Sequence, residues 1–482
     1  MKFKYLFLSL LSGILSGVSF NLPYFSFLIW VSLVFLFIVI KKSSYKVSFL
    51  YSYLAGFIHF LTIVFWIGFV TRLGLFFLLL YLSLYWAVSG LTIKGFLDKR
   101  LNFLLIPFFW VIFEYIRTNL GGFGWALFGY SQFKNLILIQ VASILGVWPI
   151  SFLIISFNTI LFNLLDAKRI KKVSSQLFIF FLLLFSFLVY GYFSLKNSLA
   201  KERIFLVTII QPNIPQQKKW DSLYYQEIED KLSSLLRRVP PQNLAIFPEA
   251  SWPCLVNEGN LKELEYLAKS SYRDILIGVV EKIQGKYFNS SFLISKGGRV
   301  LAKYRKLKLV PFGEFVPLRR VLGFIPVVSS FGDISPGKKY SVFTYKNTKI
   351  ATLICFEDTF PKLVSDFVKK GANVLVNITN DAWFRGYPQV VQHLQIAVFR
   401  AVEQRKYLIR SSNTGISCII SPKGEIIKSL RLRNKKIFVE GLLNGKIFPQ
   451  EGVTLYSKLG DIFIYIGLGF CVIGFFNSRL RS

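Results

Sequence analysis

The chain falls into a long apolar first part, a mixed second part and a short apolar end. Apolar runs separated by short polar or basic breaks fill residues 1–194. Each run is close to the roughly 20 residues that a helix needs to cross a bilayer. The expected spans are 5–20, 23–41, 47–70, 73–93, 101–116, 136–165 and 176–194, with an eighth at 461–477. We expect a polytopic membrane protein whose first span is retained, because no small-residue cleavage site follows it.

Between residues 195 and 458 the pattern changes to short β-rich runs that alternate with amphipathic stretches. The expected strands are Ile204–Ile210, Leu244–Phe247, Ile275–Val280, Ser291–Ile294, Ile350–Cys355, Val374–Ile378, Tyr407–Ser411 and Ile416–Ile420. Stretches 222–237 and 388–405 have the spacing of amphipathic helices. This pattern favours an α/β domain at 195–458, between a membrane domain of seven spans at 1–194 and a last span with its tail at 459–482.

Composition narrows the class of protein. The chain has 482 residues, of which 53% are hydrophobic and only 17% charged, which excludes a disordered chain and an ordinary soluble enzyme. Lys and Arg outnumber Asp and Glu by 58 to 25, giving a net charge of +33. Such an excess is typical either of nucleic-acid binding or of membrane segments oriented by their basic flanks.

The positions of the basic residues decide between these two uses. If the spans alternate in direction, one face of the membrane receives Lys2, Lys4, Lys41, Lys42, Lys46, Lys94, Lys99, Arg100, Lys168, Arg169, Lys171, Lys172, Arg479 and Arg481. The other face receives Arg72, Arg117 and Lys134. Because basic loops stay in the cytoplasm, both termini are expected there and the α/β domain outside it, with no nucleic-acid partner.

Three segments of the α/β domain carry residues that can do chemistry. Glu249 follows Phe247-Pro248, Lys306 lies in KYRKLKLVPFGE, and Cys355 ends Leu353-Ile354-Cys355. Sites in open α/β sheets gather beyond the carboxyl ends of strands, so these side chains can meet there. A carboxylate can take the thiol proton, and an ammonium can favour the thiolate and an oxyanion, with the N–H of Phe356 as a second donor. The structural alternative is a buried hydrophobic cysteine and a turn glutamate.

Metal and cofactor chemistry find little support in the sequence. The four cysteines are widely spaced and only two histidines are present, so no ligand cluster is visible. No Walker-type or GxGxxG motif occurs in a strand-to-helix context. We expect neither a metal nor a cofactor.

Several segments resemble the signature blocks of the nitrilase superfamily: IFPEAS (246–251), YRKLKLVPFGEFVP (304–317), LICFED (353–358) and NITNDAWF (377–384). Joined to a membrane half, and with QPNIPQQKKWD at 211–221, they resemble the apolipoprotein N-acyltransferase family. The resemblance implies an αββα sandwich domain in the periplasm, carried by eight helices of a bacterial inner membrane. It also implies Glu249 as general base, Lys306 as oxyanion stabiliser, Cys355 as nucleophile and Glu314 as a supporting carboxylate.

The activity that this resemblance implies is ping-pong transfer of a fatty acyl group from a phospholipid, through a cysteine thioester, to the lipid-modified N-terminal cysteine of an apolipoprotein. The partners are then the bilayer, a phospholipid acyl donor and a diacylglyceryl apolipoprotein acceptor, and a monomer is expected. Two alternatives stay open. A membrane-tethered nitrilase-like amidohydrolase would resolve the thioester with water, and a transporter or scaffold would carry a degenerate domain.

Further positions follow from the same resemblance. Trp220, Asn380 and Trp383 are candidates for substrate binding, and Asp381 shares their block. The chain departs from the family at Phe356, where many relatives have Tyr, and at Arg385, where the family has Gly. Loops near 220 and at 320–340 are candidate lids. Glu114 and Arg117 lie three residues apart in an expected span, where an ion pair or a functional role is expected.

Overall fold

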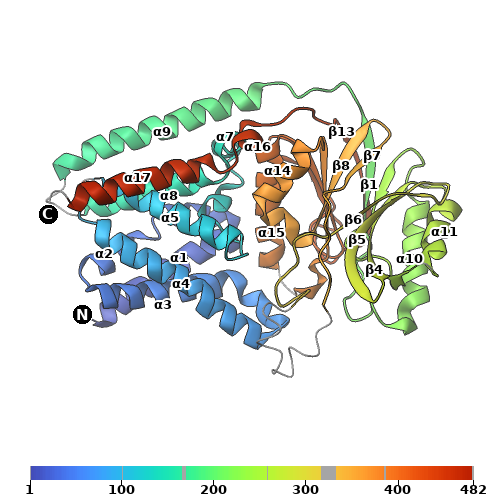
Figure 1. Ribbon diagram of the computed structural model, residues 1–482, viewed down its shortest axis with the longest axis horizontal. Helices are drawn as coiled ribbons and strands as arrows, with labels where there is room; N and C mark the ends of the chain where they lie inside the picture. The colour runs from blue at the N-terminus through green and yellow to red at the C-terminus, as the bar shows by residue number, and fades with distance from the viewer. Residues whose placement is uncertain are drawn as a thin grey trace. The chain divides into compact units, whose positions relative to one another are not determined.

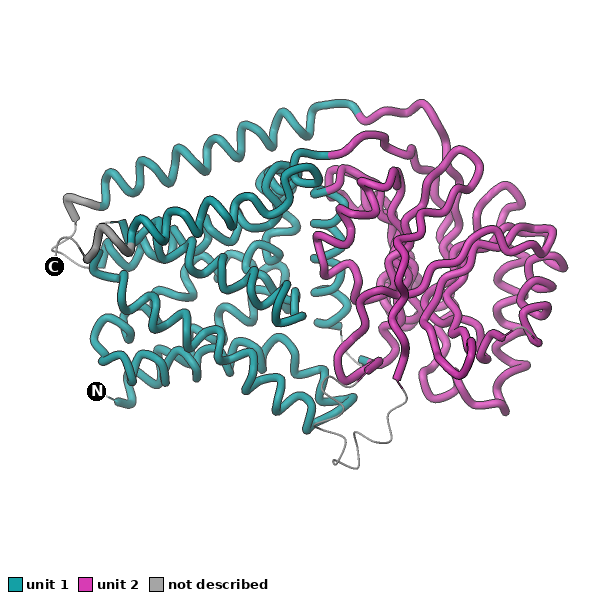
Figure 2. The backbone as a smooth tube through the Cα atoms, viewed as in Figure 1, with its two compact units in different colours: residues 1–198, 384–403, 454–482 teal, residues 199–383, 404–453 magenta. Residues whose placement is uncertain are grey.

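The computed structural model describes residues 2–99, 101–165, 170–257, 259–315, 333–384 and 387–479. The chain forms two compact units (Figure 2). Unit 1 contains residues 1–198, 384–403 and 454–482, and unit 2 contains residues 199–383 and 404–453. The predicted division at residues 194 and 458 concerns membrane topology and stays a prediction.

Unit 1 is helical. Its helices are α1 (Lys2–Asn21), η1 (Pro23–Trp30), α2 (Val34–Lys41), α3 (Tyr45–Val64), η2 (Phe65–Phe69), α4 (Arg72–Phe96), α5 (Asn102–Asn119), η3 (Phe128–Gln132), α6 (Leu136–Ile139), α7 (Ala142–Leu145), α8 (Trp148–Leu164), α9 (Ile170–Lys196), α16 (Leu455–Leu459) and α17 (Ile462–Arg479). The amphipathic α15 (Tyr387–Gln404) also belongs to it, except for its last residue.

Five helical segments among the described residues are long and apolar enough to cross a membrane. They are Lys2–Asn21, Pro23–Lys41, Tyr45–Phe69, Arg72–Phe96 and Val173–Lys196, and they coincide with five of the expected spans. The other expected spans contain shorter or less apolar helices, so the number of eight spans stays a prediction. These five segments support a membrane protein.

Close helix packing in unit 1 depends on small residues. A Cβ atom added to Gly13 of α1 would lie 2.4 Å from the carbonyl oxygen of Ala55 in α3. This contact lets the two backbones approach, as small residues do in membrane helix pairs. The expected single span at 136–165 is instead divided into α6, α7 and α8. Gly146, with a φ of 73°, ends α7, and Pro149 lies in the first turn of α8.

Unit 2 is built on two sheets. The first has the order β13-β1-β2-β4-β5-β6 with β3 beside β4, and the second has the order β12-β11-β10-β9-β8-β7. The bounds are β1 (Phe205–Gln211), β2 (Leu244–Ile246), β3 (Leu255–Val256), β4 (Ile275–Ile283), β5 (Lys286–Ile294), β6 (Val300–Arg305), β7 (Val342–Tyr345), β8 (Thr348–Ile354), β9 (Val374–Thr379), β10 (Tyr407–Ser412), β11 (Cys418–Ile420), β12 (Ile426–Ser429) and β13 (Gly441–Ile447). β1, β2 and β4 run parallel, as do β8, β9 and β10.

The sheets of unit 2 are covered by amphipathic helices. Helices α10 (Tyr225–Arg237) and α11 (Leu261–Ser271) pack their apolar residues, among them Leu232 and Leu264, against the first sheet (Figure 1). Helix α14 (Pro361–Lys369) packs beside β8 of the second sheet. Contacts between β1 and β10 and between β5 and β8 join the two sheets into a sandwich.

The eight strands expected from the sequence are confirmed, with ends that differ by a few residues. The strands that the hydrophobic pattern missed are β3, β6, β7, β12 and β13. Most of these carry exposed or charged positions, as in VLAKYR of β6 and IIKS of β12. A strand with one solvent-exposed face lacks the continuous apolar run of a buried parallel strand, so the hydrophobic pattern does not predict it.

Candidate active site

Glu249 lies just beyond the end of β2, in a turn with strained backbone. The next residue, Ala250, has a φ of 44°, a conformation that residues with a Cβ atom rarely adopt. Gly278 of β4 lies directly beneath this turn, and a Cβ atom there would lie 2.6 Å from the main-chain nitrogen of Ala250. The turn can therefore rest on β4 only because residue 278 has no side chain. Glu249 itself is 8% exposed.

Lys306 continues the ladder between β5 and β6. Its main-chain N–H donates a 2.8 Å hydrogen bond to the carbonyl of Asn289 in β5. Its ammonium is buried, 3.4 Å from a carboxylate oxygen of Glu249 and 2.9 Å from one of Glu314. Although burial opposes the charge, the carboxylates of Glu314 and Glu249 raise the pKa of Lys306 above its ordinary value. Lys306 therefore stays a cation between two carboxylates.

The side-chain amide of Asn289 links the same two carboxylates. Its Nδ2 donates to Oε1 of Glu249 at 2.7 Å and to Oε1 of Glu314 at 2.9 Å. The other oxygen of Glu249 accepts a 2.9 Å hydrogen bond from the main-chain N–H of Asn380, which follows β9. The main-chain N–H of Val310 donates to Glu314 at 2.8 Å. The Glu249 carboxylate is thus fixed at both oxygens.

Cys355 begins the short helix η6 (Cys355–Thr359) directly after β8, with a φ of 52°. This sharp strand-to-helix turn resembles the strained turns that present nucleophiles in other enzymes. The carbonyl of Cys355 accepts a 3.1 Å hydrogen bond from Nδ2 of Asn377 in β9, and Arg410 in turn donates to the Asn377 side chain at 2.8 Å. Burial, and then Glu249, raise the pKa of the Cys355 thiol, whereas Lys306 lowers it.

These side chains bring a partly exposed thiol together with a buried carboxylate and a buried ammonium. Glu249 and Lys306 act electrostatically on Cys355, and Glu314 forms a 2.9 Å ion pair with Lys306. The thiol is mostly protonated at neutral pH, so it needs a base at the moment of reaction. The structure brings together the four residues that the sequence singled out at strand ends and in the PFGEF block.

One carboxylate in this region was missed by the sequence analysis. Glu357 is buried, and its carboxylate accepts hydrogen bonds from the Tyr304 hydroxyl at 2.6 Å and from the main-chain N–H groups of Leu307 at 2.7 Å and Ile354 at 2.8 Å. Burial raises the pKa of Glu357 to about 7, against these hydrogen bonds. It ties the segment after Lys306 to the strand before the thiol. The block LICFED contained the signal, an acid two residues beyond the cysteine.

The other predicted residues of the site take different positions. Trp220 and Trp383 are 44% and 50% exposed, and their role in substrate binding stays a prediction. Phe356 is buried against Phe360, with ring centroids 5.3 Å apart. Asn380 contributes its N–H to Glu249.

Two expectations concern residues that fall wholly or partly outside the described chain. Arg385, the departure after AWF, lies outside the described residues. Of the candidate lid at 320–340, residues 320–332 lie outside them as well.

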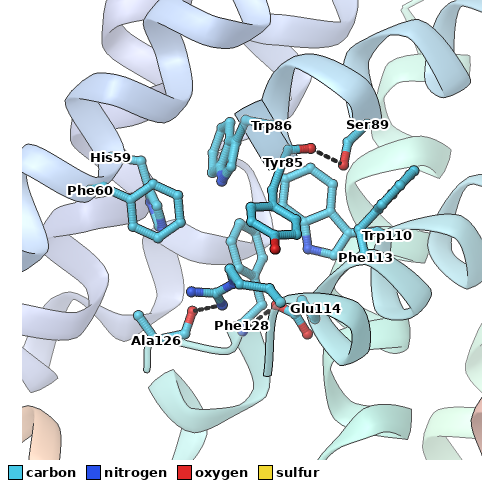
Figure 3. A pocket seen from close by; sticks show the side chains of 11 residues that line it. His59, Phe60, Tyr85, Trp86, Ser89, Trp110, Phe113, Glu114, Ala126 and Phe128 are labelled. Atoms are coloured by element: carbon cyan, nitrogen blue, oxygen red, sulfur yellow. Dashed lines mark hydrogen bonds between the residues drawn. The ribbon is translucent and has the colours of Figure 1, made fainter. Parts of the chain in front are cut away.

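Glu114 and Arg117, singled out in an expected span, line a small cavity of unit 1 (Figure 3). Its free volume of about 20 Å³ is room for one water-sized molecule. Arg117 donates to the carbonyl oxygens of Trp125 at 2.7 Å and Ala126 at 3.3 Å, and Glu114 accepts from the N–H of Phe128 at 2.8 Å. The two charged side chains therefore hold the loop after α5.

Two family models match this chain, one in its α/β part and one in its N-terminal helical part. Residues 206–440 match the family model described as carbon-nitrogen hydrolase. Residues 12–160 match the model described as apolipoprotein N-acyltransferase N-terminal domain. The first match, together with the two-sheet sandwich, confirms the expected nitrilase-like fold.

Curated relatives match over nearly the whole chain. Apolipoprotein N-acyltransferase of Geobacter metallireducens is 34% identical over 495 residues, covering 97% of this chain and 93% of that protein. The protein of that name in Aquifex aeolicus is 33% identical, covering 89% of this chain and 97% of its own length. Apolipoprotein N-acyltransferase 1 of Treponema denticola is 30% identical, with 99% of both chains covered.

Solved structures similar to this chain cover about half of it. Nit3 of Saccharomyces cerevisiae, a member of branch 10 of the nitrilase superfamily, has a TM-score of 0.40 and 18% identity, covering 52% of this chain and 92% of its own. An amidase from Nesterenkonia sp. has a TM-score of 0.40 and 16% identity, covering 56% of this chain and 99% of its own.

Proposed function

This chain belongs to the apolipoprotein N-acyltransferase family, and from this membership we propose that it transfers a fatty acyl group from a membrane phospholipid to the α-amino group of the lipid-modified N-terminal cysteine of apolipoproteins. Relatives of this name cover both units at 30% to 34% identity. The family and the long apolar helices make the chain a membrane-bound acyltransferase. We propose the phospholipid as acyl donor, the apolipoprotein as acyl acceptor and a cysteine thioester as the intermediate between them.

The first half-reaction forms an acyl-enzyme. Sγ of Cys355 attacks the carbonyl carbon of the sn-1 ester while Glu249 takes the thiol proton. Lys306, with the main-chain N–H of Phe356, stabilises the oxyanion. The ester C–O bond then breaks, Glu249 returns the proton to the leaving lysophospholipid, and a thioester remains on Cys355.

The second half-reaction moves the acyl group to the acceptor. The α-amine of the diacylglyceryl cysteine attacks the thioester carbon, and Glu249 takes the proton that the amine loses. The C–S bond breaks, and the Cys355 thiolate takes that proton as the amide is released. Both steps exchange one acyl bond for another, so the proposed reaction requires no nucleotide or redox carrier.

One observation carries this assignment. Lys306 lies 3.4 Å from Glu249 and 2.9 Å from Glu314, close enough to the thiol of Cys355 to act on it electrostatically. A buried lysine held between two carboxylates stays charged, so it is ready for an oxyanion as the tetrahedral intermediate forms. Trp220 and Trp383, exposed on the same unit, are proposed to engage the acyl chains or the acceptor.

The cellular setting belongs to the same proposal. The distribution of Lys and Arg supports both termini in the cytoplasm and the α/β domain in the periplasm of a bacterial inner membrane. The division of the chain at residues 194 and 458 then marks where it leaves and re-enters the bilayer. The bilayer supplies the phospholipid donor, and the acceptor is itself anchored in it.

Intact mass spectrometry of the purified full-length protein tests the proposal. The protein is incubated with a phospholipid of defined acyl chains and then with a diacylated lipopeptide. A hydroxylamine-sensitive adduct of the acyl mass on Cys355, discharged onto the lipopeptide amine, is the expected result. Cys355→Ala should form no adduct, whereas Cys254→Ala should behave as wild type, since Cys254 is the other partly exposed thiol.

The outcomes separate the rival functions. An adduct that decays only to free fatty acid, with the lipopeptide present, indicates an amidohydrolase-like enzyme that resolves the thioester with water. A folded wild-type protein that never acquires an adduct, under conditions in which an active relative does, contradicts the assignment of Cys355 as nucleophile.

A further inference from the structure

A second buried lysine lies against Glu249. Lys219 follows β1 in a turn that runs from residue 216 to residue 220, and its side chain is 1% exposed. Its Nζ donates a 3.0 Å hydrogen bond to the main-chain carbonyl of Glu249. The neighbouring Lys218 points outward instead, where its ammonium lies 2.9 Å from the exposed carboxylate of Glu227. Two adjacent lysines thus have opposite environments.

The turn that carries Lys219 is fixed to the second sheet of unit 2. Asn413, just after β10, accepts from the N–H of Ile214 at 2.9 Å and donates to its carbonyl at 2.8 Å. The side chain of Asn380 donates to Oε1 of Gln216 at 2.8 Å. Because Asn380 also donates its main-chain N–H to Glu249, the lysine turn and the carboxylate share one anchor. The segment that carries Lys219 is therefore held in place by hydrogen bonds from Asn380 and Asn413, which are far from it in sequence.

Lys219 changes the charge balance around Glu249. Lys306 lies between two carboxylates, Glu249 and Glu314, and these three ions leave one negative charge in a buried place. Lys219 adds a second positive charge, so these four groups together carry no net charge. Burying an unbalanced charge is costly, and a carboxylate without enough positive charge nearby binds a proton more readily.

Other charged groups near the cluster do not replace Lys219. Arg410 lies 3.3 Å from Asp381 and 3.8 Å from Asp358, so its charge is already shared by two carboxylates. The nearby Glu357 is a further carboxyl group, and burial raises its pKa to about 7. Burial lowers the pKa of Lys219 to about 8, against the attraction of Glu249. Lys219 therefore carries its charge at neutral and acidic pH, where Glu249 must be ionised to act as a base.

We propose that Lys219 is a positioning residue for proton transfer from Cys355 to Glu249, holding the strained turn at Glu249 by its main-chain carbonyl and placing a second positive charge beside this carboxylate. The proposal rests on Glu249 being the general base of the proposed function. It adds a residue that never touches substrate and acts through Glu249. Lys219→Met removes both the hydrogen bond and the charge, whereas Lys219→Arg keeps the charge.

A pre-steady-state burst assay tests this role without the natural substrates. The full-length protein in detergent is mixed with a p-nitrophenyl ester between pH 4.5 and pH 8. Sγ of Cys355 attacks the ester carbon, Glu249 takes the thiol proton, the C–O bond breaks, and p-nitrophenolate leaves as the thioester forms. Cys355→Ala gives the background rate, and Lys218→Met is the matched control for loss of a neighbouring lysine charge.

The expected result is a change in the shape of the pH profile. Lys219→Met moves the midpoint of the acid limb upward by about one pH unit. In general, loss of a neighbouring positive charge makes a carboxylate bind its proton at a pH higher by about one unit or more. Its burst is then about tenfold slower than wild type on the acid limb and within about threefold on the plateau. Lys219→Arg keeps the wild-type midpoint, and Lys218→Met superimposes on wild type.

Several results would overturn the proposal. A burst that slows equally at every pH indicates a structural role alone, and an equal change in Lys218→Met indicates a general surface-charge effect. If Lys219→Met does not fold, Lys219→Gln replaces it, because glutamine keeps a hydrogen-bond donor without the charge. The midpoint of its acid limb must then be higher than that of Lys219→Arg by the same amount. Absence of any burst in wild type overturns both proposals. A normal burst and profile change without acyl transfer from phospholipid overturns only the proposed donor.

Discussion

The main-chain N–H of Asn380 donates a 2.9 Å hydrogen bond to Oε2 of Glu249. The two residues follow strands of different sheets, β9 and β2, so this bond crosses the sandwich of unit 2. Because Oε1 of Glu249 is occupied by Asn289 and Lys306, the bond from Asn380 fixes the remaining oxygen. The orientation of the proposed base is thus set by the packing of one sheet on the other.

Replacing Glu249 by Gln should separate two properties of the thiol. Acylation of Cys355 should fall by about 10²- to 10⁴-fold, the usual contribution of a positioned base. Resting alkylation of Cys355 by iodoacetamide at pH 8 to 9 should instead become faster, because burial and then Glu249 raise the pKa of the thiol in wild type. Burst kinetics and peptide mass mapping measure the two effects. Slower alkylation in the variant would argue against an electrostatic effect of Glu249 on the thiol.

Asn289→Ala should weaken the site without changing any charge. The substitution removes the donor that Glu249 and Glu314 share, and hydrogen bonds to charged groups contribute about 1.5–3 kcal/mol. We expect an acylation rate about 10- to 100-fold below wild type, measured by the p-nitrophenyl ester burst. A rate within twofold of wild type would mean that Lys306 and Asn380 are enough to orient Glu249.

Gly278→Ala tests the close contact beneath the Glu249 turn. The added methyl group would lie 2.6 Å from the carbonyl oxygen of Pro248 and 2.7 Å from Cα of Glu249, so the turn must move. Overpacking of this kind costs about 1–3 kcal/mol, and the burst rate should fall by more than about tenfold. Gly297→Ala is the control, because the nearest atom to its added Cβ is 3.8 Å away. Equal effects in the two variants would contradict a local cause.

The stability of the wild-type protein should depend on pH through Lys219. Burial lowers the pKa of Lys219 from 10.5 to about 8, so the folded protein carries the cost of a buried charge below pH 8. Between about pH 8 and pH 10.5 the folded protein has lost a proton that the unfolded chain still binds, and stability rises with pH in this window. The full effect is about 3 kcal/mol.

Melting temperatures of wild type and Lys219→Met in detergent, compared from pH 7 to pH 10, measure this effect. The wild-type value should rise relative to that of Lys219→Met as the pH passes 8, and Lys218→Met should follow wild type at every pH. A difference that is constant with pH would show that Lys219 keeps its charge throughout the range.

Much of this molecule follows from local patterns in its sequence. Long apolar runs predict helices such as α1 and α4, and short apolar runs predict buried strands such as β8 and β9, because hydrophobic periodicity depends only on neighbouring residues. The motif blocks identified Glu249, Lys306 and Cys355, and Glu249 and Cys355 also follow strands that the apolar runs predict. The run at 136–165 was misjudged, since one glycine at 146 divides it without changing its hydropathy.

The tertiary structure decided which other residues join the site. Asn289 belongs to it because β5 pairs with β6 in a register that sets Asn289 beside Lys306. Lys219 belongs to it because Asn413 holds a turn nearly 200 residues away in sequence, with a separation of 199 to Ile214. Neither position carries a hydrophobic pattern. The sequence determined the elements through local periodicity and indicated the reactive residues through its motif blocks, whereas sheet register and long-range hydrogen bonds selected the polar groups that position them.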